Sequence, residues 1–411
     1  MKKLLILGDT GKTDRLIELA KARGIYTIIT DDRDKKQSKC KLIADESWDI
    51  SVYDTDTLEK LSIERGITAI TCGASENCMD ATRKLCKRLN LPFYVSDYAW
   101  EITNDKLKFK QLCRQYGIPV VKEYMPDISL GTKEMEHIEY PVVVKPTDSC
   151  SSIGFHLCEN EEDLIDGYRD AYHKSKTNRV VIEKFYSGVE ISLIFGFNRG
   201  ESYLIEAGAT FGDRKDDIPF VFGYGPADCL GRLEKELFPQ LSKLFNELGC
   251  YEGIACIQVI FEGDEYAVTE MNYRLPGGAS PIQDYMCQIV LDYALNEDYL
   301  ASISQPEPVN VSAYLVSLKP GKIASVEGVE SIRELPGIAY VKINMEDGTV
   351  IEPDSGMRRI FCIIVSALPF NQFKSQISTI NELLKVTDDN GNDMVMRLIL
   401  DENNNVIDGG L

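Results

Sequence analysis

Short apolar segments alternate with amphipathic segments along the first quarter of the chain, and this alternation is the strongest constraint on the fold. The strands are expected at residues 3–7, 26–30 and 68–71, and the helices at residues 13–23, 55–65 and 76–89. Strands joined by crossover helices pair in parallel, and the helices cover the faces of the sheet. The sequence therefore predicts a doubly wound α/β domain over residues 1–103.

From residue 104 the chain becomes strand-rich, and Pro306 and Pro308 are typical of a boundary further on. Helices are expected at residues 104–116, 161–171 and 232–248, and strands at residues 254–261 and 266–273. We therefore predict a two-lobed α+β core over residues 104–304, with a lid at about residues 115–190, and a C-terminal α+β lobe over residues 305–411.

The charge of the chain excludes some classes of partner. Acidic residues outnumber basic ones by 65 to 45, so the formal net charge is −20. Such a surface repels nucleic-acid phosphates and anionic lipid. The apolar run that begins at Leu4 ends at Gly8, which is short for a secretory signal. We expect a soluble, cytoplasmic protein that binds neither nucleic acid nor membrane.

The 12 cysteines have no C-x-x-C spacing, and none of the 3 histidines stands at zinc-ligand spacing to another ligand. We interpret the cysteines as reduced thiols that serve as small apolar residues. The glycine-rich segment 8–13 looks like a phosphate-binding loop, but the position where a Walker A loop needs its first glycine holds Ile6. We interpret Gly8 as a turn between a strand and a helix.

A lysine closes an apolar strand in the core. Lys145 follows three valines, and burying its ammonium group is costly unless the group meets an anion. The next residues are small, which lets backbone N–H groups and hydroxyls approach phosphate oxygens, although a simple turn is an equal alternative. The residues of this loop that we select are Ser149, Ser151, Ser152 and Gly154.

Two glutamates, Glu183 and Glu190, flank the end of one strand and the start of the next. Carboxylates at such positions suit the amino group of a base and the hydroxyls of a ribose. Taken alone, solvated surface charge is the simpler interpretation.

The strand over residues 266–273 turns from apolar to polar along its length. Period-2 geometry predicts that one face carries Tyr266, Val268, Glu270, Asn272 and Arg274. Oxygen ligands of this kind suit Mg²⁺ beside nucleotide phosphates, and a salt-bridged pair on an exposed strand is the alternative. A three-residue turn at 263–265 would place Gln258 opposite Glu270, whereas a two-residue turn would place Ile257 there.

In their order along the chain, these elements resemble the ATP-grasp superfamily, in the branch of carbamoyl phosphate synthetase, biotin carboxylase and the L-amino acid ligases. The resemblance covers about residues 1–300 and is weaker from 301 to 411. The motifs that carry it are Asp105-Lys106, the Lys145 strand with its small-residue loop, Glu183-Lys184-Phe185, Gly188-x-Glu190 and Glu270-x-Asn272-x-Arg274.

The resemblance implies ATP and Mg²⁺ as cofactors, with Mn²⁺ as an alternative ion. Phosphate contacts are implied for Lys106, Lys145 and the loop of Ser149, Ser151, Ser152 and Gly154. Adenine contacts are implied for Glu183, Lys184 and Phe185, and a ribose contact for Glu190. Metal ligation is implied for Gln258, Glu270 and Asn272, and catalytic roles for Lys145 and Arg274.

Two departures from the family pattern concern the metal and the loop. Gln258 stands where most relatives have Asp or Glu, although carbamoyl phosphate synthetase also has glutamine there. Ser151 and Ile153 stand where many relatives have glycine and a basic residue.

The resemblance implies an ATP-dependent carboxylate–amine ligase that works through an acyl phosphate and joins amino acids or a related carboxylate and amine. The alternatives are a carbamoyl-phosphate-synthetase-like enzyme that activates bicarbonate or carbamate, and an ATP-binding regulatory protein without turnover. Residues 211–226 and 275–278, and the pair Arg358 and Arg359, are candidates for binding the small-molecule carboxylate and amine substrates. The resemblance is also compatible with a homodimer.

Overall fold

The computed structural model describes most of the chain. The described residues are 2–35, 37–124, 137–148, 153–186, 188–211, 220–224, 230–278, 280, 282–298, 311–353 and 359–400, with the backbone alone at 211, 220–224 and 311. None of the helices among these residues is long and apolar enough to cross a membrane.

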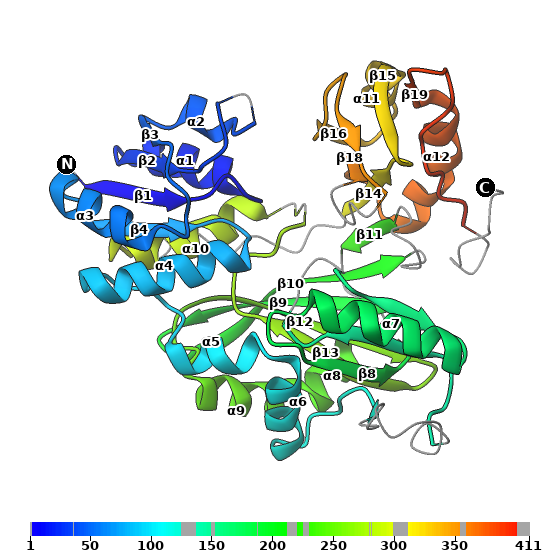
Figure 1. Cartoon of the computed structure of the whole chain (residues 1–411), viewed down its shortest axis with the longest axis horizontal. Helices are drawn as coiled ribbons and strands as arrows, with labels where there is room; N and C mark the ends of the chain where they lie inside the picture. The colour runs from blue at the N-terminus through cyan, green and yellow to red at the C-terminus, as the bar shows by residue number, and fades with distance from the viewer. Residues whose placement is uncertain are drawn as a thin grey trace.

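The N-terminal part is a parallel sheet with helices on both faces, as predicted (Figure 1). The strand order is β3-β2-β1-β4, and α10 from later in the chain packs against α1 and β4. The elements are β1 Lys3–Leu7, α1 Thr13–Ala22, β2 Tyr26–Thr30, α2 Cys40–Ile43, β3 Glu46–Trp48, α3 Thr55–Arg65, β4 Ala69–Cys72, α4 Glu76–Leu89 and α10 Gln283–Leu295.

An eight-stranded sheet runs through the centre of the molecule in the order β13-β12-β9-β10-β11-β14-β18-β16. Its last three strands come from the C-terminal part, so the core and the C-terminal part share one sheet. The strands are β9 Glu190–Asn198, β10 Glu201–Phe211, β11 Phe220–Tyr224, β12 Gly253–Glu262, β13 Glu265–Asn272, β14 Val311–Ser317, β16 Ile338–Ile343 and β18 Ile360–Ser366.

Two smaller sheets complete the α/β fold. A four-stranded sheet of order β5-β8-β6-β7 carries α7, and a three-stranded sheet of order β17-β15-β19 lies in the C-terminal part. The elements are β5 Glu123–Tyr124, β6 Val142–Pro146, β7 His156–Cys158, α7 Glu161–Lys174, β8 Val180–Lys184, β15 Gly321–Glu327, α11 Val329–Arg333, β17 Val350–Ile351, α12 Phe370–Leu383 and β19 Lys385–Asp388. The domain limits proposed from the sequence stay a prediction.

Several helices differ from their sequence-based limits. The single helix expected over 232–248 is wrong: α8 Leu230–Glu236 and α9 Phe238–Leu248 are separate, with Pro239 in the first turn of α9. Proline has no N–H to donate and favours the start of a helix. The helix expected from residue 104 begins later, as α6 Lys106–Gln115, and α5 Asp97–Thr103 before it was not predicted.

A β-bulge at Thr269 sets the register of the β12–β13 hairpin. The turn has two residues, since Glu262 pairs with Glu265, but Thr269 is skipped and Gln258 pairs with Glu270. The predicted pairing is therefore confirmed, although the three-residue turn that motivated it is wrong. Directly opposed residues point to the same face, so the bulge turns Glu270 to the face opposite Val268. The expectation of one shared face for residues 266–274 is thus also wrong.

The second face of the central sheet belongs to the hydrophobic core. Phe195 and Phe197 of β9 pack against Phe245 of α9, with ring centroids 5.3 and 5.0 Å apart.

Cysteines contribute to the cores, and the ten that the structure describes are buried free thiols. Burial raises the pKa of the Cys86 thiol to about 12. The interpretation of these ten as small apolar residues is confirmed.

Gly188 allows the link between β8 and β9 to approach β12 closely. A Cβ atom at this position would overlap the carbonyl oxygen of Phe261. The Phe261 N–H also donates to the Val189 carbonyl oxygen at 3.0 Å, so the two backbones cannot move apart without losing this bond.

We expect Gly188→Ala to lower the free energy of unfolding by about 1–3 kcal/mol, because the new methyl group displaces backbone. Urea unfolding followed by circular dichroism measures this change. Gly231→Ala is the matched control, because its added methyl group meets no atom within 4 Å, and it should change stability by less than about 1 kcal/mol. Equal midpoints for the wild type and Gly188→Ala would contradict the close approach.

Candidate active site

The register of the central sheet places the predicted metal ligands on one face. Glu270, Gln258, Ser192 and Gly208 are successive cross-strand partners on β13, β12, β9 and β10. Because opposed residues point to the same face, these four side-chain positions form one row across the sheet.

A second row lies beside the first on the same face. Asn272, Cys256, Ile194 and Glu206 are successive partners on the same four strands. Polar side chains therefore occupy both ends of this row, while its middle is apolar.

Hydrogen bonds join the residues at the β13 end. The Asn272 Nδ2 atom donates to Glu270 Oε1 at 3.0 Å, and Arg274 Nη2 lies 3.5 Å from Asn272 Oδ1. Gln258 Nε2 donates to Glu190 Oε1 at 3.2 Å, so Glu190 also lies at this cluster. We call Gln258, Glu270, Asn272 and Arg274 the β13 cluster.

Lys106 reaches the β13 cluster from the first turn of α6. Asp105 caps this helix by accepting hydrogen bonds from the backbone N–H groups of Leu107 and Lys108. The cap fixes the start of α6, and Lys106 Nζ lies 3.9 Å from Glu270 Oε2. Burial alone would raise the pKa of Glu270, but the ammonium groups of Lys106 and Lys145 outweigh it and hold this pKa below its usual value.

Lys145 approaches from the small sheet, at the end of β6. Its Nζ atom lies 2.9 Å from Glu183 Oε2, and its side chain is 17% exposed. Burial and the nearby ammonium of Lys106 lower the pKa of Lys145 to about 8. Two lysines from different elements thus bring positive charge to one place, and their phosphate contacts stay a prediction.

Sequence reasoning missed Lys110, which completes this arrangement. The Lys110 ammonium contacts the Glu183 carboxylate and lies 3.6 Å from Glu123 Oε1, and its side chain is fully buried. A signal was present, because Lys110 follows Lys106 by four residues and so lies on the same face of the helix. The Glu183 carboxylate is occupied by Lys110 and Lys145, and its adenine contact stays a prediction.

Lys184 and Phe185, which the resemblance implies as adenine contacts, lie at the end of β8. The Phe185 N–H donates to the Pro141 carbonyl oxygen at 3.1 Å, and Lys184 Nζ lies 3.0 Å from Glu262 Oε2. Gly154 has a φ of +74° and lies against Pro146. Ser149, Ser151 and Ser152 lie outside the described residues.

Arg274 connects the β13 cluster to the N-terminal part. Its Nη2 atom lies 3.1 Å from Oε1 of Glu76, the first residue of α4. Sequence reasoning missed Glu76, and no local pattern links two residues so far apart.

Two arginines were further candidates for binding a carboxylate substrate. Arg359 is half-buried just before β18, whereas Arg358 lies outside the described residues.

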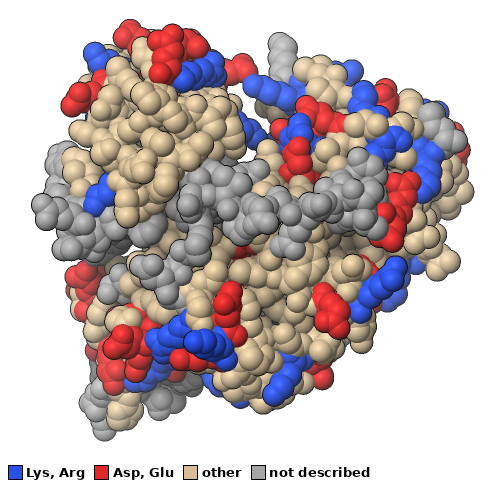
Figure 2. Space-filling view, turned by 180° about the vertical axis from the view of Figure 1, so that it is seen from behind, with Lys and Arg blue, Asp and Glu red and all other residues tan. Residues whose placement is uncertain are grey.

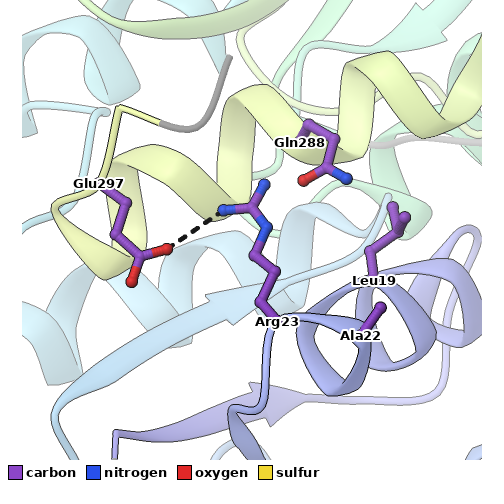
Figure 3. A pocket seen from close by; sticks show the side chains of 5 residues that line it. All are labelled: Leu19, Ala22, Arg23, Gln288 and Glu297. Atoms are coloured by element: carbon purple, nitrogen blue, oxygen red, sulfur yellow. Dashed lines mark hydrogen bonds and ion pairs between the residues drawn. The ribbon is translucent and has the colours of Figure 1, made fainter. Parts of the chain in front are cut away.

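A shallow cavity of about 380 Å³ lies between α1 and α10, away from the β13 cluster. It is lined by Leu19, Ala22, Arg23, Gln288 and Glu297, and Figure 3 shows the Arg23 guanidinium directed toward Glu297. Arg23 Nη1 lies 2.6 Å from Asp292 Oδ1 and 3.4 Å from Glu297 Oε2. The cavity shares no residue with the predicted site, and we assign it no role.

Acidic and basic side chains are interspersed on the surface face that Figure 2 shows. The cationic groups that converge on Glu183 and Glu270 belong instead to side chains that are mostly buried. Three lysines, Lys106, Lys110 and Lys145, are therefore clustered in the interior of a protein whose net charge is negative.

We expect Lys110→Met to lower the free energy of unfolding by about 3–5 kcal/mol, because the buried carboxylates of Glu183 and Glu123 each lose one of their cationic partners. Chemical denaturation measures the change. Lys108→Met on the same helix is the matched control, since the Lys108 pair with Glu101 is solvent-exposed and should contribute less than about 1 kcal/mol. Similar losses for the two variants would contradict a structural role for the buried contacts.

Two family models match separate parts of the chain. The model described as D-ala D-ala ligase C-terminus matches residues 112–202, and the one described as L-amino acid ligase C-terminal domain 2 matches residues 313–387.

Among curated relatives, the 2-oxoglutarate carboxylase small subunit of Hydrogenobacter thermophilus is 26% identical over 187 residues, which span 42% of this chain and 39% of the relative. The D-alanine–D-alanine ligase of Desulforudis audaxviator is 29% identical over 54% of this chain and 74% of the relative. The carbamoyl phosphate synthase large chain of Clostridium beijerinckii is 23% identical over 76% of this chain but 30% of its own length. The chain thus spans well under half of two of these three relatives.

Solved structures with the same fold cover nearly the whole chain. The L-amino acid ligase from Bacillus licheniformis has a TM-score of 0.77 at 18% identity, covering 94% of this chain and 99% of that one. The biotin carboxylase domain of the Hydrogenobacter thermophilus 2-oxoglutarate carboxylase, solved with MgADP, ADP and bicarbonate, has a TM-score of 0.72 at 18% identity, covering 96% and 91%. The chain therefore has the ATP-grasp fold, and its family matches and relatives lie in the ATP-grasp superfamily beside carbamoyl phosphate synthetase, biotin carboxylase and the L-amino acid ligases.

Proposed function

We propose that the protein is an ATP- and Mg²⁺-dependent carboxylate–amine ligase that works through an acyl phosphate and joins amino acids or a related carboxylate and amine. The observation that carries the proposal is the convergence of Lys106 and Lys145, from two different elements, on the face that holds the β13 cluster. Positive charge beside oxygen ligands is what a magnesium-bound polyphosphate requires.

The residues at this face fit a magnesium nucleotide. Glu270, Gln258 and Asn272 offer side-chain oxygens from adjacent positions on β12 and β13, and Glu190 lies beside Gln258. Few of these oxygens are carboxylate oxygens, which suits an ion that also takes phosphate oxygens and water as ligands. When bound, Mg²⁺ would neutralise charge on the phosphates.

The chemistry needs a carboxylate made reactive toward an amine. A carboxylate oxygen attacks the γ-phosphorus and ADP leaves, then the amine nitrogen attacks the carbonyl carbon, phosphate leaves and the nitrogen loses a proton. Lys106 and Lys145 would hold the phosphates, and Arg274 would stabilise the phosphoryl group in transfer. Arg274 would be oriented for this by Glu76 at 3.1 Å.

The small sheet would act as the lid. It carries Lys145 and Glu183, and the Lys110–Glu183 contact joins it to α6. Closing over the substrates would exclude water, which would otherwise hydrolyse the acyl phosphate.

A carbamoyl-phosphate-synthetase-like reaction with bicarbonate or carbamate is the second candidate. The alignment with the Clostridium beijerinckii large chain over 76% of this chain favours it. An ATP-binding protein without turnover would have little use for the hydrogen-bonded set of Glu270, Asn272 and Arg274.

We expect Lys145→Ala and Glu270→Ala each to lower the rate of ADP release by at least about 100-fold, because each removes a charged group from the phosphate site. A coupled assay for ADP, with Mg-ATP and pooled L-amino acids and D-alanine, measures the rate. Glu265→Ala is the matched control on the same strand, since Glu265 is exposed, and it should keep the wild-type rate. Near-wild-type ADP release by folded Lys145→Ala or Glu270→Ala would overturn the site.

A further inference from the structure

Glu206 of β10 occupies a position on the site face that the proposed reaction does not use. It ends the cross-strand row that begins at Asn272 and passes over Cys256 and Ile194. Three strand spacings of about 4.8 Å put the two ends of this row roughly 14 Å apart. Glu206 therefore lies on the same face as the β13 cluster but at the far end of the row.

The floor between the two ends is apolar or small. Cys256 and Ile194 are 8% and 3% exposed, and the parallel row contributes Ser192 and Gly208. The side chains next to Glu206 on this face are thus small or apolar, and none of them carries a charge.

The Glu206 carboxylate is partnered by a hydroxyl group. Ser280 Oγ donates to Glu206 Oε2 at 2.5 Å, and no ion pair joins Glu206 to a cation among the residues that the structure describes. Burial raises the pKa of Glu206 to about 7, although the Ser280 hydrogen bond and the charge of Lys12 oppose the rise. A carboxylate held away from water in this way is stabilised when a cation reaches it.

Lys12 contacts the chain segment after Arg274, two residues before Ser280. It comes from the glycine-rich turn after β1, is 5% exposed, and donates from Nζ to the Gly278 carbonyl oxygen at 2.6 Å. Gly11 allows this approach, since a Cβ atom there would lie 3.3 Å from the Gly277 carbonyl oxygen. The segment that follows Arg274 is thus fixed between Lys12 and Glu206.

We propose that Glu206 is a specificity-determining residue that binds the ammonium group of an amino acid substrate, with residues 274–278 and Ser280 as the wall of that subsite. The inference rests on the proposed ligase function and narrows the class of its carboxylate substrate to acids that also carry a charged amino group. Lys12 acts as a positioning residue, because it contacts the wall.

The test is equilibrium binding by calorimetry, with Mg²⁺ and a non-hydrolysable ATP analogue present. The probes are the individual L-amino acids and D-alanine, each compared with its deaminated acid, such as propionate for alanine. We expect the wild type to bind at least one amino acid about tenfold or more tightly than its deaminated acid. Glu206→Gln should lose that preference, while its affinity for the deaminated acid stays unchanged.

Two further variants keep the test decisive. Glu206→Asp retains the charge and should retain part of the preference, even where Glu206→Gln folds poorly. Glu201→Gln is the matched control, because Glu201 is exposed on the same strand. An unchanged preference in folded Glu206→Gln, or no amino acid binding by the wild type, would overturn the inference.

ADP release then separates this inference from the proposed function. Glu206-dependent binding without ADP release in Mg-ATP would support the subsite and overturn the ligase. ADP release with bicarbonate or with an acid that has no amino group, and no amino acid binding, would support ATP-dependent activation and overturn the subsite.

Discussion

One buried carboxylate, that of Glu183, organises the small sheet around the site. It receives the ammonium groups of Lys110 from α6 and Lys145 from β6, and its own strand, β8, lies between β5 and β6 in the small sheet. Each of these charges would be costly to bury alone, so each depends on the others. The contact joins the small sheet to α6, and α6 begins with Lys106, whose Nζ atom lies 3.9 Å from Glu270 Oε2. Glu183 therefore links Lys145 to α6, the helix that also carries Lys106.

The central sheet supplies the second constraint, which is its register. The bulge at Thr269 turns Glu270 and Asn272 to the face that also carries Gln258 and Glu206. Without the extra residue, these side chains would point into the core occupied by α9. The unpaired residue Thr269 thus decides whether the polar side chains of β13 lie on the site face or are buried in the hydrophobic core.

Much of the fold followed from pattern alone, because short strands and helices in the N-terminal part have strong periodicity. The break between α8 and α9 could have been predicted from Pro239, because proline favours the first turn of a helix. It was missed because the apolar residues keep helical spacing across the break. The pairing of Gln258 with Glu270 was predicted for the wrong reason, since a bulge compensates for the shorter turn. Bulges have no reliable local signature, so the shared face of Tyr266 and Glu270 was predicted wrongly.

Contacts between distant segments were the part that the sequence could not show. Glu76 meets Arg274, and Lys12 meets Gly278, only because the N-terminal sheet packs on the core. The glycine-rich turn lacks the Walker A spacing, and its lysine instead faces the segment after Arg274. The residue types and their spacing along the chain indicated an anion site and oxygen ligands. The packing of the N-terminal sheet on the core determined which of these side chains contact each other.

The central claim is that the protein activates a carboxylate by phosphorylation, and an isotope measurement tests it most directly. The protein would be incubated with Mg-ATP and a pool of amino acids labelled with ¹⁸O in their carboxyl groups, and the released phosphate analysed by mass spectrometry. An acyl phosphate transfers one carboxyl oxygen to phosphate, so the account predicts phosphate that carries a single ¹⁸O atom. Phosphate released without ¹⁸O would contradict it.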